Sequence, residues 1–124
     1  MRIIIKFFVR LFVCVFLSVF GLGSWQTSAS AENDVIGMRL GEIDFKGYSA
    51  LRLVIETAKP LDAQLFLLND PWRLVVDSIG LTWNVSGLES SGQLFTSPAI
   101  AYRFGHPKAG TGRLVLEMNA PFSP

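Results

Sequence analysis

The chain has 124 residues, the length of one ordinary domain; 50% of them are apolar and only 17% are charged, with a formal net charge of +1. These values exclude a multi-spanning membrane protein, a disordered chain and a large two-domain enzyme. The apolar excess is uneven, because residues 1–31 contain 20 of the apolar residues and 5 of the 10 Phe. We therefore expect an apolar leader followed by a small globular domain.

The leader has the three parts of a secretory signal peptide. A basic start, an apolar run and a small-residue cleavage site follow one another: Arg2, Lys6 and Arg10, then residues 11–20, then Ala29-Ser30-Ala31. The charge-free apolar stretch ends at Leu22 and is too short for a membrane-spanning helix, which needs about 20 residues. We expect export, cleavage after Ala31 and no stable membrane anchor in the mature protein; an uncleaved anchor is the alternative.

The mature domain expected at residues 32–124 would carry 8 basic and 10 acidic side chains, a formal charge of −2. No basic footprint for nucleic acid remains, so we expect no nucleic-acid partner. The leader also takes away Cys14, the single Cys, so an apolar core or a partner must hold the domain together. Export without disulfides fits a bacterial periplasm, which is the predicted location.

Four runs of the mature chain are rich in Leu, Val and Ile and alternate with the period of a β-strand. Breaks that contain Pro, Gly or Asn separate them, and no convincing helical stripe occurs. Residues 86–98 predict a long connection with room for one short strand or turn. His106 lies between Gly105 and Pro107 in a predicted hairpin turn. The four predicted strands are Leu51–Thr57, Ala63–Leu68, Trp72–Ser78 and Arg113–Met118.

An internal repeat indicates the architecture. The first copy contains residues 36–41 (IGMRLG), residues 52–56 (RLVIE) and Pro60. The second copy contains the corresponding residues 100–105 (IAYRFG), 113–117 (RLVLE) and Pro121. The longer link within the first copy predicts a longer hairpin loop there. The fold class predicted is all-β, a small β-sandwich built from two similar β-units packed face to face. The second unit stops at Pro124, so we expect it to be truncated at its C-terminus.

Residues 73–77 (RLVVD) add a third copy of the pattern Arg, Leu, Val, aliphatic, acid. Alternate residues of a strand share a face, so Arg, Val and the acid lie together and the other face is apolar. Between antiparallel neighbours each Arg would lie opposite an acid, and such a pair contributes about 0.2–1 kcal/mol. A solvated ion-pair face is the plainer interpretation and a ligand surface the other. The predicted core side chains are Leu51, Leu53, Ile55, Trp72, Leu74 and Val76.

The segment Asp70–Asp77 (DPWRLVVD), with an apolar strand before it and Arg-(Leu or Phe)-Gly hairpins on either side, resembles the AMIN domain. That domain lies at the N-terminus of periplasmic N-acetylmuramoyl-L-alanine amidases and also occurs in secretins of type IV pili. The resemblance covers about residues 35–122. It implies a β-sandwich of two symmetric sheets that localises its parent protein by binding peptidoglycan. The chain departs from the family at Ser78, where the family continues apolar, and in its missing last strand.

Catalysis is not expected within this chain. The amidases of the family hold zinc with His and Glu side chains, and a zinc site needs three or four protein ligands. The mature chain has one His and no Cys, and it contains no nucleophile elbow, phosphate loop or metal-ligand spacing. We expect no cofactor here, with zinc confined to a catalytic domain of the parent amidase outside this chain.

The expected function is that of a non-catalytic module that binds peptidoglycan and targets its parent enzyme to the cell wall or division site. Forked guanidinium groups suit the carboxylates of this polymer, and aromatic rings suit its sugars. The alternative is a protein-interaction module of a secretin, divisome or other envelope complex, acting through an exposed strand edge or through Trp83 and Tyr102. The candidate ligand-binding residues are Arg39, Arg52, Arg73, Arg103 and Arg113.

Overall fold

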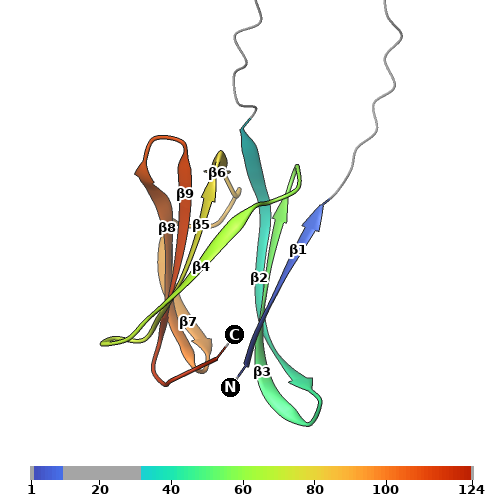
Figure 1. Cartoon of the computed structure of the whole chain (residues 1–124), viewed down its shortest axis with the longest axis vertical. Helices are drawn as coiled ribbons and strands as arrows, with labels where there is room; N and C mark the ends of the chain where they lie inside the picture. The colour runs from blue at the N-terminus through green and yellow to red at the C-terminus, as the bar shows by residue number, and fades with distance from the viewer. Residues whose placement is uncertain (1, 10–31, 124) are drawn as a thin grey trace, which may run out of the picture.

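The computed structural model describes residues 2–9 and 32–123, and in this part the chain is all-β (Figure 1). Two sheets pack face to face as a small β-sandwich, which confirms the predicted fold class. None of the described residues forms a helix that is long and apolar enough to cross a membrane. The strands are β1 (Arg2–Val9), β2 (Asn33–Phe45), β3 (Tyr48–Thr57), β4 (Ala63–Leu68), β5 (Arg73–Ile79), β6 (Leu81–Trp83), β7 (Ser91–Thr96), β8 (Ala99–Lys108) and β9 (Thr111–Met118).

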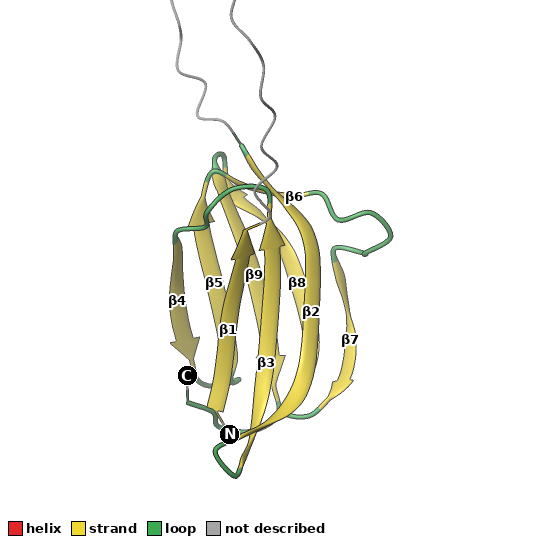
Figure 2. Cartoon of the chain, turned by 90° about the vertical axis from the view of Figure 1, so that its right-hand side faces the viewer, coloured by secondary structure: helices red, strands yellow, loops and turns green. Residues whose placement is uncertain are grey.

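The two sheets are built around the two repeated hairpins. Sheet A has the strand order β1-β3-β2-β6 and sheet B the order β4-β5-β9-β8-β7, so hairpin β2–β3 lies in one and hairpin β8–β9 in the other (Figure 2). Equivalent residues of the repeat pair in the same register: Gly41 lies opposite Arg52 in the first hairpin, and Gly105 lies opposite Arg113 in the second. The sequence repeat is therefore also a structural repeat.

The prediction that the two copies differ in loop length is wrong. Both hairpins close with two residues, Lys46-Gly47 and Ala109-Gly110, and the second residue of each turn has a positive φ of 79° and 76°. Glycine adopts this conformation without steric cost, which explains why each tight turn ends in Gly. The first hairpin is longer because its strands have 13 and 10 residues, against 10 and 8 in the second.

The four strands predicted from the alternating pattern are present as β3, β4, β5 and β9. The side chains assigned to the core are buried there, with Trp72 half-buried beside β5. Trp72 packs edge-on against Phe122, with 6.5 Å between the ring centroids. The connection expected at residues 86–98 contains one strand, β7, as anticipated.

His106 does not lie in a turn, contrary to the prediction. It lies within β8, where the pairing with β9 is irregular between Gly105 and Lys108. Pro107 cannot donate a ladder hydrogen bond, but an irregular stretch tolerates it, so the strand continues to Lys108 and the turn forms at the next glycine.

Residues Arg2–Val9, which have the sequence features of a signal-peptide start, form strand β1 in the described chain. This strand pairs in parallel with β3 from Arg2 opposite Ala50 to Val9 opposite Thr57. Ile3 is only 4% exposed and packs in the core. The apolar run and the cleavage site of the predicted leader lie outside the described residues. Cleavage after Ala31 would remove β1, and the export of the protein stays a prediction.

The second unit contributes fewer strands than the first to the described chain. After β3 the first unit continues into β4 and β5, whereas the described chain after β9 ends at Ser123 beside the start of β1. There the backbone N–H of Ile3 donates to the carbonyl of Ser123 at 2.9 Å. Within residues 2–9 and 32–123, β4 and β5 thus have no counterpart from the second unit.

Candidate functional site

The five candidate arginines do not come together in one site. Arg39 on β2 and Arg52 on β3 lie on the outer face of sheet A, whereas the other three lie on the outer face of sheet B. The sheet B arginines are Arg73 on β5, Arg103 on β8 and Arg113 on β9. The two groups are therefore considered separately.

On sheet B, β5 and β9 pair antiparallel in the register that the repeated motif predicts. Arg73 lies opposite Glu117, and Asp77 lies opposite Arg113. Between these pairs Val75 and Val115 face each other and are buried although they point outward. The aliphatic stems of long charged side chains cover apolar surface in this way.

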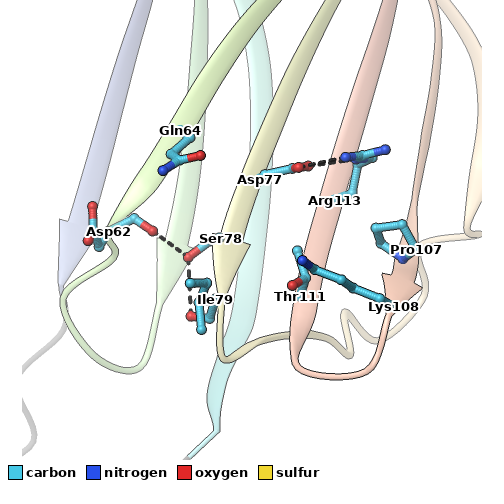
Figure 3. Close-up of a pocket in the computed structure, with 9 residues that line it drawn as sticks. All are labelled: Asp62, Gln64, Asp77, Ser78, Ile79, Pro107, Lys108, Thr111 and Arg113. Atoms are coloured by element: carbon cyan, nitrogen blue, oxygen red, sulfur yellow. Dashed lines mark hydrogen bonds and ion pairs between the residues drawn. The ribbon is translucent and has the colours of Figure 1, made fainter.

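Arg113 and Asp77 form a two-pronged ion pair (Figure 3). Nε and Nη2 of the guanidinium donate to Oδ1 and Oδ2 of the carboxylate, each at 2.6 Å. The hydrogen bonds from Arg113 lower the pKa of Asp77 below its usual range against the opposing effect of burial, and the pair raises the pKa of Arg113. Within the described chain, Asp77 accepts from two of the five guanidinium N–H groups and no other acceptor is bonded, so Arg113 is fixed in orientation and can still bind a second acceptor.

Arg113 borders a depression of about 340 Å³ at one end of sheet B. Figure 3 shows Gln64, Asp77 and Lys108 around it, on three different strands. Ser78 also lines this depression, and its hydroxyl donates to the carbonyl of Asp62 at 2.6 Å. This bond accounts for the polar Ser78 at a position where an apolar residue was expected, because a buried hydroxyl needs a partner.

A second hollow of about 260 Å³ adjoins Arg113 on its other side. Gly105 lies opposite Arg113 and has open space where a Cβ would stand, so its missing side chain creates this hollow. The walls come from Arg103, Phe104 and His106. The two adjoining depressions around Arg113 are called the Arg113 site below. Its cations suit a carboxylate, and the apolar part of its lining, which includes Val115, suits a ring or an aliphatic chain.

Several residues of the Arg113 site could not be predicted from the sequence. Gln64 is the one polar side chain of β4, and its position became clear only from the pairing of β4 with β5, where it lies opposite Asp77. Lys108 was hidden because the expected turn around His106 placed it outside the strand. Among the described residues, no cluster of three or more His, Cys, Asp and Glu side chains could hold a metal ion.

Trp83 and Tyr102 are buried, so the expectation that they form an interaction surface is wrong. Trp83 stacks on Phe104 with 4.7 Å between ring centroids, and the Tyr102 hydroxyl donates to the carbonyl of Glu89 at 3.1 Å. Both side chains serve the core. Exposed aromatic side chains lie elsewhere, at Tyr48, Phe66 and Phe95.

The outer face of sheet A repeats part of this arrangement. Arg39 and Glu56 form an ion pair, as do Arg103 and Glu117 on sheet B at 3.8 Å. Arg52 borders a depression of about 470 Å³ beside Gly41, yet its Nε is buried and has no hydrogen-bond partner in the described part of the chain. Among the described residues, this face thus has no two-pronged ion pair like that of Arg113 with Asp77.

The ion pair at the Arg113 site predicts a specific dependence of stability on pH. Because the pKa of Asp77 is lower in the folded than in the unfolded state, the pair stabilises fully above the unfolded pKa of about 3.9 and loses this effect as pH falls through the folded pKa. We expect Asp77→Asn to reduce the free energy of unfolding by about 1 kcal/mol at pH 7 and by less below pH 4. Urea unfolding at several pH values measures this. Glu89→Gln, in a loop, is the control, and a loss for Asp77→Asn that is the same at pH 3 and pH 7 would contradict the prediction.

No protein-family model matches the chain, and neither a search of curated proteins nor one of solved structures finds a match. The resemblance to the AMIN domain therefore depends on the sequence motifs of this chain.

Proposed function

We propose that the domain is a non-catalytic peptidoglycan-binding module, exported to the periplasm, that localises a parent N-acetylmuramoyl-L-alanine amidase at the cell wall. The observation that supports this most is the Arg113 site. A guanidinium held in place by Asp77 keeps unused donors beside a hollow and near Lys108. Peptidoglycan offers carboxylates on its peptides and apolar faces on its sugars, and both features suit these two depressions.

Sedimentation with purified sacculi tests this function. We expect Arg113→Ala to weaken binding about tenfold, because a lost charge-assisted hydrogen bond costs roughly that factor. Arg113→Lys should recover only part of it, since an ammonium group keeps the charge but not the fork. Raising the salt concentration should weaken the wild type, because exposed charges are screened.

A matched pair of glycine variants separates the Arg113 site from sheet A. Gly105→Leu should fill the hollow beside Arg113 and block binding, whereas Gly41→Leu makes the same change beside Arg52 and should leave binding unchanged. Circular dichroism must first show that each variant is folded. If folded Arg113→Ala and Gly105→Leu sediment like wild type, the arginine face is structural and the proposal fails.

A second candidate function, a protein-interaction module of an envelope complex, is supported by strand β4. Its residues Leu65–Leu68 are consecutive, apolar and 40–43% exposed at the edge of sheet B. Exposed apolar edge strands are places where other chains pair or dock. Wild-type protein that stays in solution with sacculi would favour this candidate.

A further inference from the structure

The edge of β3 differs from the equivalent edge of β9. In sheet B, β9 pairs with its hairpin partner β8 on one side and with the antiparallel strand β5 on the other. In sheet A, β3 pairs with its hairpin partner β2 in the same way, but its other neighbour is β1, which runs parallel. The structural repeat thus predicts an antiparallel strand at the place where β1 lies.

Arg52 shows what this antiparallel strand would supply. Its counterpart Arg113 donates from Nε to Asp77 of β5, whereas Nε of Arg52 is buried and has no hydrogen-bond partner within residues 2–9 and 32–123. On β1 the residue opposite Arg52 is Ile4, and Lys6 lies opposite Val54. An unpaired buried N–H group is costly, and a nearby cation adds to that cost. The edge of β3 therefore fits a strand with a carboxylate opposite Arg52 better than it fits β1.

The core face of β4 shows that room remains beside β1. Leu65 and Leu67 pair with Val76 and Leu74, so they point to the core side of sheet B. Val76 and Leu74 are fully buried, yet Leu65 and Leu67 are each 43% exposed. Figure 2 shows β4 on the far side of β1 from β3, where sheet A has no strand facing it. The apolar core face of sheet B thus extends beyond β1, on the side of β1 that points away from β3.

We infer that the edge of β3 is an acceptor site for an antiparallel β-strand of another polypeptide. The register of β5 on β9 gives its chemistry: a carboxylate opposite Arg52, an aliphatic residue opposite Val54 and a basic side chain opposite Glu56. The described strands that carry this pattern, β3, β5 and β9, are already paired within the fold. The occupant therefore comes from outside the described residues, and it either displaces β1 or takes the edge after the leader is cleaved.

A second copy of the sandwich does not fit this edge through its own β3. Sheet B extends past β3 on this side, so β4 and β5 of two copies joined at β3 would occupy the same space (Figure 2). A single strand or a hairpin without a second layer can enter. Recognition by added strands gains main-chain hydrogen bonds, and the alternate side chains give specificity. This inference does not depend on peptidoglycan binding, because it uses Arg52 and not the Arg113 site.

A peptide with the sequence of residues 69–80 (NDPWRLVVDSIG) is the probe, because β5 already fits the equivalent edge. The protein is the full chain with Ile3→Asp, which places a charge at a buried position of β1 and should release that strand. We expect the peptide to bind, to raise the melting temperature and to slow amide hydrogen exchange in β3. With the folded wild-type chain, saturating peptide should displace β1 and so speed amide hydrogen exchange at residues 2–9. This measurement keeps the test valid if the Ile3→Asp variant fails to fold.

Changes on both sides of the contact test the register. Arg52→Gln in the protein should weaken peptide binding about tenfold. Replacing the peptide's second Asp, which corresponds to Asp77, with Asn should have the same effect. Together they should cost little more than either alone, because they break the same pair. Lys59→Gln removes the same charge from the loop that follows β3 and should leave peptide binding unchanged.

Four results would overturn the inference. The first is that the peptide does not bind to the folded Ile3→Asp chain, and the second is that the peptide protects the amides of β4 or β7, and not those of β3, from hydrogen exchange. The third is that the protein forms Arg52-dependent dimers without peptide, and the fourth is that peptide binding is lost when the chain is extended by the sequence that follows Pro124 in its gene. The last result would show that the occupant belongs to the same polypeptide. Failure of sacculus binding alone would leave this inference standing, since that assay reports on Arg113.

Discussion

Leu114→Ala should lower the free energy of unfolding by about 3 kcal/mol. Leu114 is fully buried at the centre of β9 and packs in the core with side chains from both sheets. Truncation removes apolar surface and leaves a cavity that the surrounding strands cannot close. A domain of this size is stable by only about 5–15 kcal/mol, so the change removes a large share of its stability.

Urea unfolding of Leu114→Ala beside Leu68→Ala measures this effect. Leu68 undergoes the same chemical change on β4, where its side chain is 40% exposed, and should lose less than about 1 kcal/mol. Equal losses for the two variants would show that β9 is not the centre of the core.

Gly112→Ala is expected to destabilise the domain by about 2–3 kcal/mol, although it adds a single methyl group. A Cβ at Gly112 would lie 2.6 Å from the carbonyl oxygen of Leu81 and 2.9 Å from its Cβ. Both atoms belong to the backbone or its first branch, so β6 and β9 must move apart.

Gly105→Ala is the matched control, since among the described residues, apart from its two chain neighbours, no atom lies within 4 Å of an added Cβ there. It should change stability by less than about 0.5 kcal/mol. Thermal unfolding of both variants tests the close approach of β6 to β9, and a Gly112→Ala protein as stable as wild type would contradict it.

The internal repeat explains why so much of the fold could be predicted. Alternating apolar residues gave the core face of β3, and the repeated Arg-Leu-Val motif gave the register that brings Asp77 to Arg113. Both signals are local, because a strand shows its two faces in its own sequence.

Other parts of the fold depended on contacts distant in sequence. The segment Arg2–Val9 has a basic start and β-branched apolar residues, a pattern shared by signal peptides and strands, so its pairing with β3 could not be predicted. Trp83 lies on a strand of three residues, which is too short to show an alternation. Its burial depends on the stacking with Phe104, which comes from β8.

The ion pair of the Arg113 site could be predicted from the sequence, but the two depressions beside Arg113 could not. Arg113 and Asp77 share a repeated motif, so their pairing followed from register. The depressions beside Arg113 depend on Gly105 and Lys108 around an irregular stretch of β8 and on Gln64 of the edge strand β4. The sequence contains no local signal for the neighbour of an edge strand or for a register shift, so these residues could be placed only by the structure.

An NMR titration of the isotope-labelled protein with soluble peptidoglycan fragments tests the proposed function most directly. We expect the largest shifts at the Arg113 side chain and at the amides of β5, β8 and β9 around it, and we expect Gly105→Leu to abolish them. Shifts confined to sheet A or to β4 would contradict the proposed function. The absence of shifts at fragment concentrations that fully compete with sacculi for the protein would contradict it as well.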